Sequence, residues 1–348
     1  MFLKFVQNIF GLDISERNLR LTQLKKSGNK ILLVSYNEIK VPAGVFKDNQ
    51  IVKKDEIIQL IRKLISEVKG SKIYTKYVAV CLPEPKTFVK VIDLTYPKTK
   101  DVVTEIIEEA KKHIPYPLEK TYLDWQYVDE KSKDRIMIGV CPKEIVANYQ
   151  DTLIKAGLFP IALEIEATAI ARSLFPLNKK IPEPVMVLDL GASRTGLFIY
   201  QENYIPFSLS LNISSNDLTN WVKDKLQLTL EQAEAAKRKI GLHEDKAQGG
   251  LKRVLSEPLS KLAEQMREAK YFYYEHFPFQ KEIKTVYLTG GGANLADLTQ
   301  FLAAKTDLAA TLANPRLNLT AGKIDLPAEA AQSYATAIGL ALRVYQEK

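Results

Sequence analysis

The apolar and polar positions near the start of the chain alternate in a way that predicts a β-hairpin. An apolar run ends at Asp13, and two alternating segments follow at residues 19–24 and 31–36, on either side of a turn that contains glycine. Asp55 then begins a segment with apolar residues at helical spacing, which ends at Gly70. The first part of the chain therefore has the order strand, aspartate, hairpin, helix.

The pattern changes between residues 77 and 157, where short apolar strands dominate. It predicts strands at residues 77–82, 88–92, 122–128 and 136–141, and helices at residues 101–113 and 143–156. Residues 162–174 are predicted to form another helix, before a proline-rich linker at residues 181–184. We therefore expect a compact β-rich unit inserted into the first half of the chain.

The second half of the chain repeats the order of the first. A strand at residues 185–190 carries Asp189 near its end, and a hairpin follows. The pattern then predicts helices at residues 216–226, 230–240 and 251–277, a strand at residues 285–288, a glycine turn, and helices that begin near residues 295 and 328. Asp13 and Asp189 lie about half a chain length apart, so the pattern indicates a duplicated α/β fold that holds a nucleotide between its halves.

The composition is typical of a soluble globular protein with room for about two domains. The 348 residues are 46% hydrophobic and 26% charged. The net charge is +8, but the lysines are scattered along the chain, so we expect no nucleic-acid binding and at most a weak attraction to anionic membranes. There is no membrane-length apolar stretch and no signal-peptide cleavage site near the N-terminus, which predicts a cytoplasmic protein. Cys81 and Cys141 fall in apolar strands and are expected to be buried thiols.

The loop that follows the second aspartate has the residue types of a phosphate site. Gly191 and Gly196 allow positive φ, so that successive backbone N–H groups can enclose an anion. Ser193 and Thr195 add hydroxyl donors, and Asp189 is placed to hold Mg²⁺ through water. A plain β-turn with a capping aspartate explains the same loop, and the loop alone does not decide between them.

Two other segments add to this chemistry. Gly290, Gly291 and Gly292 lie between a strand and a helix, where they allow a flat ring to approach the backbone. Glu234 and Lys237 are three residues apart on one helical face. They form either a solvated pair or, beside a bound nucleotide, a contact to its ribose.

The three loops, in this order and at these separations, resemble the phosphate-1, phosphate-2 and adenosine motifs of the actin-like ATPase superfamily. Residues 78–83, 114–119 and 122–125, together with the two ends of the chain at 10–15 and 334–343, resemble the PilM family of type IV pilus assembly proteins, which is related to FtsA. The resemblance implies an α/β, two-domain actin-like ATPase fold with an inserted β-rich subdomain in the first half.

The resemblance also implies limits for four subdomains. The first actin-like subdomain comprises residues 1–76 and 158–182, and the insert comprises residues 77–157. The second actin-like subdomain comprises residues 183–215 and 283–348, and residues 216–282 form its helical subdomain.

Site residues follow from the resemblance by position. The cofactors are ATP and Mg²⁺, and Asp13 and Asp189 flank the metal through water. The other implied contacts are Gly191, Ser193 and Thr195 to phosphate, Glu234 and Lys237 to ribose, and Gly290, Gly291 and Gly292 to adenine and the α-phosphate. Glu166 matches the residue that orients the attacking water, although an exposed helix acid explains it equally well.

The first phosphate loop departs from the superfamily pattern. Ser15 stands where a glycine is usual, Glu16 and Arg17 replace small hydroxyl residues, and Arg20 stands near the usual lysine. Ser15 and Arg20 remain implied nucleotide contacts. We therefore expect ATP binding with weak or no hydrolysis.

The resemblance implies a cytoplasmic scaffold of pilus assembly. Its partners would hold it at the inner face of the plasma membrane, and it is compatible with self-association. Its implied partner is the cytoplasmic N-terminal segment of the membrane protein PilN, in a groove lined from residues 77–157, with residues 114–118 or 122–127 as candidates.

Two alternatives remain open. One is a small-molecule kinase on the same fold, which would need a polar substrate cluster that the sequence does not show. The other is an FtsA-like membrane-tethered polymer, for which the apolar residues of the segment 2–10 are a candidate contact. That reading expects an amphipathic segment after the last helix, and the sequence ends at Lys348 without one.

Overall fold

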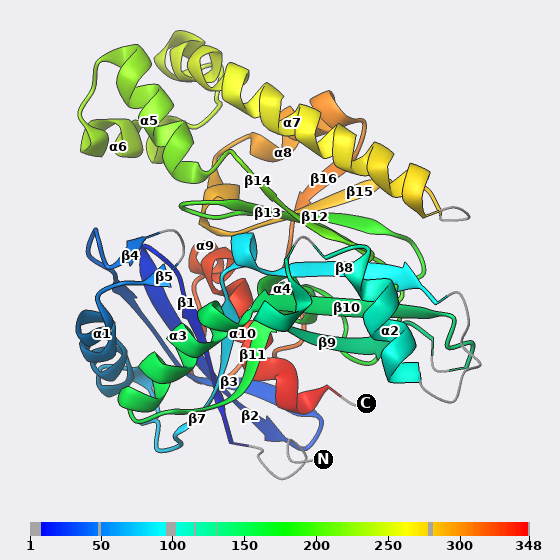
Figure 1. The fold of residues 1–348 in the computed structure, drawn as a ribbon. Helices are drawn as coiled ribbons and strands as arrows, with labels where there is room; N and C mark the ends of the chain where they lie inside the picture. Colours follow the sequence, from blue (N-terminus) through cyan, green and yellow to red (C-terminus); the bar gives the residue numbers. More distant parts are fainter. Residues whose placement is uncertain are drawn as a thin grey trace.

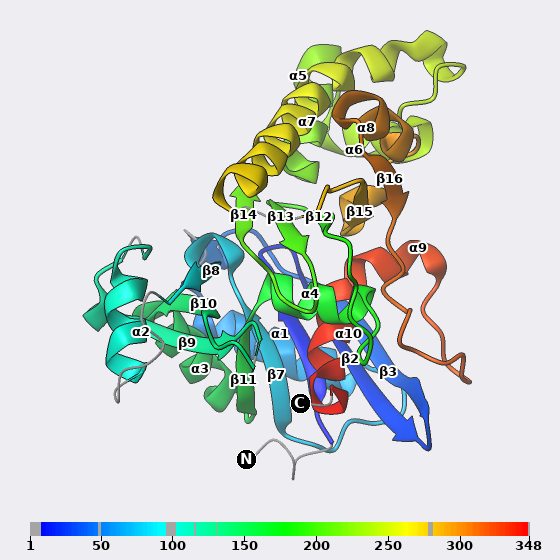
Figure 2. The same ribbon diagram turned by 90° about the vertical axis from the view of Figure 1, so that its right-hand side faces the viewer.

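The structure is a computed structural model that describes residues 8–47, 50–94, 102–114, 116–129, 131–277 and 281–346. Two large β-sheets form its halves; helix α4 (Glu166–Leu174) lies between them, and helix α10 (Ala335–Leu342) packs against the sheet of the first half (Figure 1). A turned view shows the second half above the first, with the inserted unit beside the first (Figure 2). The arrangement is the duplicated α/β fold that the sequence predicts.

The sheet of the first half has six strands in the order β11-β7-β1-β2-β3-β6. β1 pairs antiparallel with β2 and parallel with β7, and β7 pairs parallel with β11. Their bounds are β1 (Phe10–Ile14), β2 (Asn18–Ser27), β3 (Lys30–Lys40), β6 (Lys69–Gly70), β7 (Tyr77–Leu82) and β11 (Phe159–Ile165). Helix α1 (Lys54–Ser66) follows a small ribbon of β4 (Phe46–Lys47) and β5 (Gln50–Ile51).

The sheet of the second half repeats this topology with five strands in the order β14-β13-β12-β15-β16. β12 pairs antiparallel with β13 and parallel with β15, as β1 does with β2 and β7. Their bounds are β12 (Val185–Leu190), β13 (Thr195–Tyr200), β14 (Ser208–Leu211), β15 (Thr285–Thr289) and β16 (Ala309–Leu312). Asp13 and Asp189 therefore occupy equivalent positions on the two central strands.

The inserted unit consists of a three-stranded sheet and helix α2. The strand order is β8-β10-β9, with bounds β8 (Phe88–Asp93), β9 (Thr121–Tyr127) and β10 (Arg135–Pro142); α2 is Val102–Lys111. β7 belongs to the six-stranded sheet, and α3 (Lys143–Lys155) buries Ile145, Tyr149 and Leu153 in the core of the first half. We therefore place the sheet of the insert at residues 88–142, inside the expected limits of 77–157.

The helix expected at residues 162–174 is wrong in its first part. Residues up to Ile165 form β11, which pairs parallel with β7, and helix α4 begins only at Glu166. The alanine, leucine and glutamate in this segment favour a helix locally. Pairing with β7 partly buries Leu163 and Ile165 against the core, and this tertiary contact overrides the local preference.

The helices of the second half cover its sheet. They are α5 (Ser215–Leu226), α6 (Leu230–Ile240), α7 (Gly250–His276) and α8 (Leu298–Thr306), and α9 (Ala328–Ala331) leads into α10. Reciprocal hydrogen bonds of Ser214 with Asp217, and of Thr229 with Gln232, begin α5 and α6. The short edge strand β16 has no counterpart in the pattern of the sequence.

Two glycines allow the close approach of elements at the junction of the halves. A Cβ atom on Gly339 of α10 would overlap the backbone carbonyl of Ala169 in α4, and one on Gly11 of β1 would overlap the carbonyl of Ala337. α10 therefore packs directly against both α4 and the central strand of the first half.

Three further expectations concern the surface and the thiols. Residues 2–7 of the apolar N-terminal segment lie outside the described residues, whereas Ile9 and Phe10 are buried. Among the residues that the structure describes, no helix is both long and apolar enough to cross a bilayer. Cys81 and Cys141 are free and buried, as predicted.

Candidate functional site

The two aspartates of the duplicated strands meet in a cluster of charged side chains between the halves. Asp13 lies near the end of β1 and Asp189 near the end of β12, and the negative charge of Asp13 contributes to the raised pKa of Asp189. Burial raises the pKa of both Asp13 and Asp189 to about 7, and the negative charge of Glu166 adds to the effect. The two aspartates are thus within electrostatic reach of each other, and their role as a metal site stays a prediction.

Arg194 supplies the positive charge of the cluster. Its Nη2 lies 2.5 Å from Glu166 Oε2, and its Nε lies 4.0 Å from Glu84 Oε2. Burial opposes a charge on Arg194, but the Glu166 and Glu84 carboxylates outweigh it and raise the pKa of the guanidinium. Arg194 therefore joins the loop after β12 to two positions of the first half: Glu166 at the start of α4, and Glu84 in the turn after β7.

Glu166 is the first residue of α4, and only 6% of it is exposed. One oxygen receives the Arg194 hydrogen bond, and the other accepts a hydrogen bond of 3.3 Å from the Thr336 hydroxyl. The alternative of an exposed helix acid is therefore wrong. Whether Glu166 orients an attacking water stays a prediction, because in this structure its carboxylate is paired with a guanidinium.

Gly191 and Gly196 are needed for a reason other than the one expected. Neither has positive φ among the described residues. A Cβ atom on Gly196 would lie 2.9 Å from Glu84 Oε1, and one on Gly191 would lie 2.8 Å from the carbonyl oxygen of Arg194. The expected positive φ is thus wrong, and the two glycines instead make room for a tight loop and for the Glu84 carboxylate.

The hydroxyl groups of the two phosphate loops differ in their availability. Ser193 is exposed at the loop tip, whereas Thr195 is buried and its hydroxyl donates to the carbonyl of Ile213 at 2.5 Å. Ser15 donates its hydroxyl to the Asn18 carbonyl at 2.9 Å and so closes the turn between β1 and β2. The phosphate contacts of all three residues stay predictions. Ser15 and Thr195 would have to give up these hydrogen bonds to donate to phosphate, whereas Ser193 would not.

Arg20 connects the first loop to the aspartate. It pairs with Asp13 across the β1–β2 hairpin, and its Nη1 lies 3.8 Å from Asp13 Oδ2. Its Nη2 lies 3.1 Å from Glu38 Oε1, and its guanidinium carbon lies 5.9 Å from the centroid of the Tyr334 ring. The positive charge expected here is present, although it is held beside Asp13 and Glu38.

The glycine turn packs against the end of β12. Gly290 has φ of 81°, and a Cβ atom there would overlap Asp189 Oδ1. A Cβ atom on Gly292 would lie 2.6 Å from Leu190 Cγ, whereas one on Gly291 would lie 3.1 Å from the Ser333 hydroxyl. Packing alone thus accounts for two of the three glycines, and the turn lies directly beside Asp189.

Glu234 and Lys237 form a network between α5 and α6. Lys237 Nζ lies 2.8 Å from Glu234 Oε2, 2.6 Å from the Thr219 hydroxyl and 2.8 Å from the Ser215 carbonyl. Burial lowers the pKa of Lys237, and the guanidinium of Arg17, in the turn after β1, acts in the same direction. The pair therefore lies across from the first phosphate loop, but its ribose contact stays a prediction.

The sequence analysis missed Glu84, Arg194 and Thr336 as members of the cluster. Glu84 is buried, burial raises its pKa well above the usual range, and its Oε2 has no hydrogen-bond partner in the described part of the chain. An arginine inside a presumed phosphate loop was the one signal available for Arg194. Nothing local marks Glu84 or Thr336, which reach the cluster only through the fold.

The donor set suits a hydrated Mg²⁺. Asp13 and Asp189 offer carboxylate oxygens, the ligands that this ion prefers, and burial raises the pKa of both, so that a bound cation would favour their ionised form. Among the described residues, no three His, Cys, Asp or Glu side chains are arranged to hold a metal. Phosphate and water would therefore have to supply most ligands.

The charge state of the aspartates makes stability depend on pH. Because burial raises their pKa from 3.8 to about 7, protonation stabilises the fold fully below about pH 4, and this stabilisation is lost as the pH rises through about 7. Asparagine resembles the protonated form. We expect the natural chain to lose about 2 kcal/mol of unfolding free energy between pH 5 and pH 8 relative to Asp13→Asn/Asp189→Asn. Urea denaturation of both at four pH values measures this, and parallel pH profiles would contradict it.

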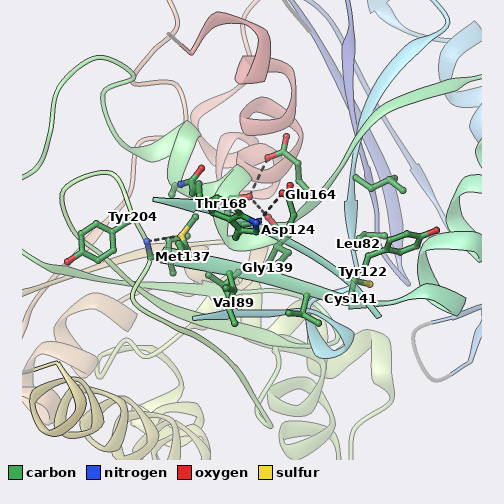
Figure 3. A pocket seen from close by; sticks show the side chains of 18 of the residues that line it. Leu82, Val89, Tyr122, Asp124, Met137, Gly139, Cys141, Glu164, Thr168 and Tyr204 are labelled. Atoms are coloured by element: carbon green, nitrogen blue, oxygen red, sulfur yellow. Dashed lines mark hydrogen bonds between the residues drawn. The ribbon is translucent and has the colours of Figure 1, made fainter. Parts of the chain in front are cut away.

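A second feature is a cavity of about 520 Å³ between the insert and the first half. Tyr122, Asp124 and Gln126 of β9 line one wall, and Leu163 and Ile165 of β11 line another. Figure 3 shows Tyr122, Asp124 and Gly139 beside Glu164 and Thr168 around this space. The segment 122–127, one of the two segments expected to line the groove for PilN, thus lies at this cavity.

Charged side chains form the polar end of this cavity. Glu164 Oε2 lies 2.7 Å from Arg172 Nη2, and Glu164 Oε1 lies 3.0 Å from Arg343 Nη1. Burial opposes ionisation of Glu164, but the two arginines hold its pKa below the usual range. The other candidate segment, 114–118, contributes Leu118 to a smaller apolar pocket under α2, and its Pro115 lies outside the described residues.

The chain resembles known proteins over almost its whole length. Residues 11–345 match the family model of the type IV pilus assembly protein PilM. A solved PilM-PilN type IV pilus biogenesis complex contains a chain with 24% identity and a TM-score of 0.83, with 97% of this chain and 99% of that chain covered.

More distant structures share the fold alone. The ethanolamine utilization protein EutJ of Carboxydothermus hydrogenoformans has a TM-score of 0.59 at 16% identity, covering 96% of this chain and 88% of that one. MreB5 of Spiroplasma citri, solved with ADP, has a TM-score of 0.56 at 13% identity, covering 96% and 95%. The family match, the duplicated sheets and the insert agree, and the chain belongs to the PilM family of type IV pilus assembly proteins.

Proposed function

We propose that this chain is a scaffold of type IV pilus assembly that binds Mg-ATP between its halves and the cytoplasmic N-terminal segment of PilN in the cavity beside the insert. The observation that carries the proposal is the pairing of two sites in one fold of this family: the aspartates of the duplicated strands, and a cavity bounded by two sheet edges. Through PilN the scaffold would be peripheral at the inner face of the membrane.

The aspartate cluster supports the nucleotide site. Asp13 and Asp189 would hold Mg²⁺ through water, while the glycine turn beside Asp189 offers backbone to the nucleotide. Mg²⁺ bound to phosphate supplies the positive charge that the cluster lacks. Binding would thus favour the ionised aspartates and pull on elements of both halves, which suits a ligand-dependent change in their relative position.

The pairing of Glu166 supports weak or no hydrolysis. A carboxylate that orients water must offer a free oxygen to it, but one Glu166 oxygen faces Arg194 and the other accepts from Thr336. Arg194 would first have to move toward phosphate. We therefore propose that ATP acts mainly as a ligand of this scaffold and is turned over slowly.

The sheet edges support the PilN site. β9 is the last strand of the insert sheet, β11 is the last strand of the six-stranded sheet, and residues of both line the cavity. An extended peptide can add to such an edge through backbone hydrogen bonds, with its side chains in the pocket. The apolar wall and the Glu164–Arg172 pair at one end provide room for both apolar and polar side chains.

Binding of a synthetic PilN segment to Tyr122 variants tests this site. Tyr122 is 55% exposed and lines the cavity, so Tyr122→Ala should remove contact area without disturbing the core. We expect its affinity to fall at least about tenfold in fluorescence anisotropy, as for an aromatic anchor. The control Tyr271→Ala changes a tyrosine on α7 that is 64% exposed, and it should bind normally. Equal affinity of both variants and the natural chain would exclude this cavity as the groove.

A further inference from the structure

The end of the six-stranded sheet at which its parallel strands begin carries lysines and aromatic rings together; we refer to this end as an edge of the molecule. The strand registers align Phe159 with Tyr77, Val78 with Phe10, and Phe10 with Gln23. The amino ends of the parallel strands and the tip of the β2–β3 hairpin therefore lie at the same edge. This edge is at the end of the molecule away from β12–β16 (Figure 1).

The connection from β6 to β7 crosses this edge. The Ser35 hydroxyl bonds to the Ser71 carbonyl at 2.5 Å, and the Thr75 hydroxyl bonds to the Asn8 carbonyl at 2.8 Å. The connection is thus fixed to β3 at one end and to the residue preceding β1 at the other. It adds its own side chains to those of the hairpin tip.

We call the resulting surface the basic edge and define it by its exposed lysines and aromatic residues, Lys25, Lys26, Lys30, Lys72, Tyr74, Lys76, Tyr77 and Phe159. None of its five lysines has an ion-pair partner within the described residues. Exposed lysines are common in this chain, but elsewhere many face an acidic neighbour. Here their charge is directed outward without compensation.

The aromatic rings of the basic edge are unusually exposed. Tyr74 is 85% exposed, Phe159 55% and Tyr77 39%, and the rings of Tyr77 and Phe159 lie 6.2 Å apart. Exposed aromatic rings beside lysines are typical of surfaces that contact the headgroup region of a bilayer. Such rings at the start of two buried strands have no evident role in the core.

The sequence before β1 extends this character. Phe2, Leu3, Lys4, Phe5 and Val6 precede Asn8, whose side chain accepts a hydrogen bond of 3.0 Å from Gln23. The chain therefore enters the fold at the basic edge, directly after an apolar segment that contains a lysine.

From these observations we infer that the basic edge contacts an anionic lipid surface directly, which goes beyond membrane association through PilN. Lysines near an anionic membrane each add about 1 kcal/mol of attraction, and exposed rings add apolar contact. Exposed rings beside lysines suit the headgroup region of a bilayer, and the oligonucleotide in the test below separates lipid from nucleic acid.

The position of the edge agrees with the proposed PilN site. Helix α3 contributes Val146 and Gln150 to the cavity, and its last turn carries Ile154, which is 52% exposed, and Lys155 toward Phe159. A peptide that leaves the cavity along α3 would reach the basic edge. A membrane-anchored segment in the cavity would thus hold this edge near the bilayer.

Sedimentation of the natural chain with vesicles tests the inference without PilN. The vesicles contain phosphatidylglycerol and phosphatidylethanolamine, and phosphatidylcholine vesicles are the neutral comparison. The test variant Lys25→Glu/Lys26→Glu/Lys30→Glu changes only the exposed hairpin end. The control Lys225→Glu/Lys239→Glu/Lys261→Glu changes the same charge on the exposed surface of α5, α6 and α7. Tyr74→Ser/Phe159→Ser tests the aromatic contribution.

We expect binding to the anionic vesicles only, a loss of about tenfold or more for the hairpin variant and for the aromatic variant, and a change under about threefold for the control. Equal losses in the hairpin variant and the control would show an effect of net charge and overturn the inference. So would binding to a single-stranded oligonucleotide with no binding to vesicles. Binding of the PilN segment is measured in the absence of lipid, so a failure of the lipid inference and a failure of the PilN proposal can be told apart.

Discussion

Arg194→Ala is expected to lower the free energy of unfolding by about 3–5 kcal/mol at neutral pH, a large fraction of what a domain has. The guanidinium is the shared partner of Glu166 and Glu84, and the side chains of these three residues are only 15%, 8% and 6% exposed. Without it, two carboxylates would remain between the halves with no compensating charge. Removing one partner of a buried ion pair costs far more than the pair itself contributes.

Urea denaturation measures this loss, and an exposed arginine provides the control. Arg238 Nε lies 2.8 Å from Glu234 Oε1, but the Arg238 side chain is 78% exposed. Arg238→Ala should therefore cost less than about 1 kcal/mol. A loss below about 1 kcal/mol for Arg194→Ala would show that the pair does not hold the halves together.

Arg194 also acts on the charge of the two aspartates. Its guanidinium lies beside the aspartates and lowers the pKa that their burial raises, as a bound cation would do more strongly. If Mg²⁺ binds the two aspartates as proposed, Arg194 could turn from Glu166 and Glu84 toward the phosphate. Release of Glu166 and Glu84 from Arg194 would loosen one connection between the halves while the nucleotide forms another.

The sequence predicts those parts of the fold that depend on local periodicity. The strands β1, β7 and β12 and the helices α5 and α6 appear near their expected bounds, because their apolar spacing and their caps are local signals. β11 was misread as part of a helix, because its parallel pairing with β7 is a contact between segments far apart in the sequence. β16 at the sheet edge gave no pattern at all.

The same distinction applies to the site. Asp13 and Asp189 were predictable because each follows a buried strand and because the strands are duplicated. Glu84 was not, since it follows a strand end that looks ordinary and reaches Arg194 only after the halves pack. Gly196 was recognised for the wrong reason: its lack of a side chain makes space for Glu84, a residue more than a hundred positions away.

The cavity beside the insert could be anticipated only from the resemblance to the PilM family. Its walls come from the insert, from β7, β11, α3 and α4, from residues 200–205 of the second half and from the end of the chain, and no single segment shows a binding pattern. Alternation along β9 predicts two faces, with Tyr122 and Asp124 on one and Leu123 and Trp125 on the other. Which face meets the first half follows only from the packing of the insert.

The second large effect expected is that of Mg-ATP on stability. A ligand that binds only the folded state at a concentration a hundred times its Kd raises the free energy of unfolding by about 2.7 kcal/mol. Asp189→Ala should abolish this gain, because Asp189 is one of the two carboxylates proposed to hold Mg²⁺ through water and lies against Gly290 of the glycine turn. Asp224→Ala, at an exposed position of α5, should keep it.

The melting temperature of the natural chain, Asp189→Ala and Asp224→Ala, each with and without millimolar Mg-ATP, tests the central claim most directly. The account predicts a clear upward shift for the natural chain and Asp224→Ala, and none for Asp189→Ala. No shift in the natural chain, or the same shift in all three, would contradict a nucleotide site between the two aspartates.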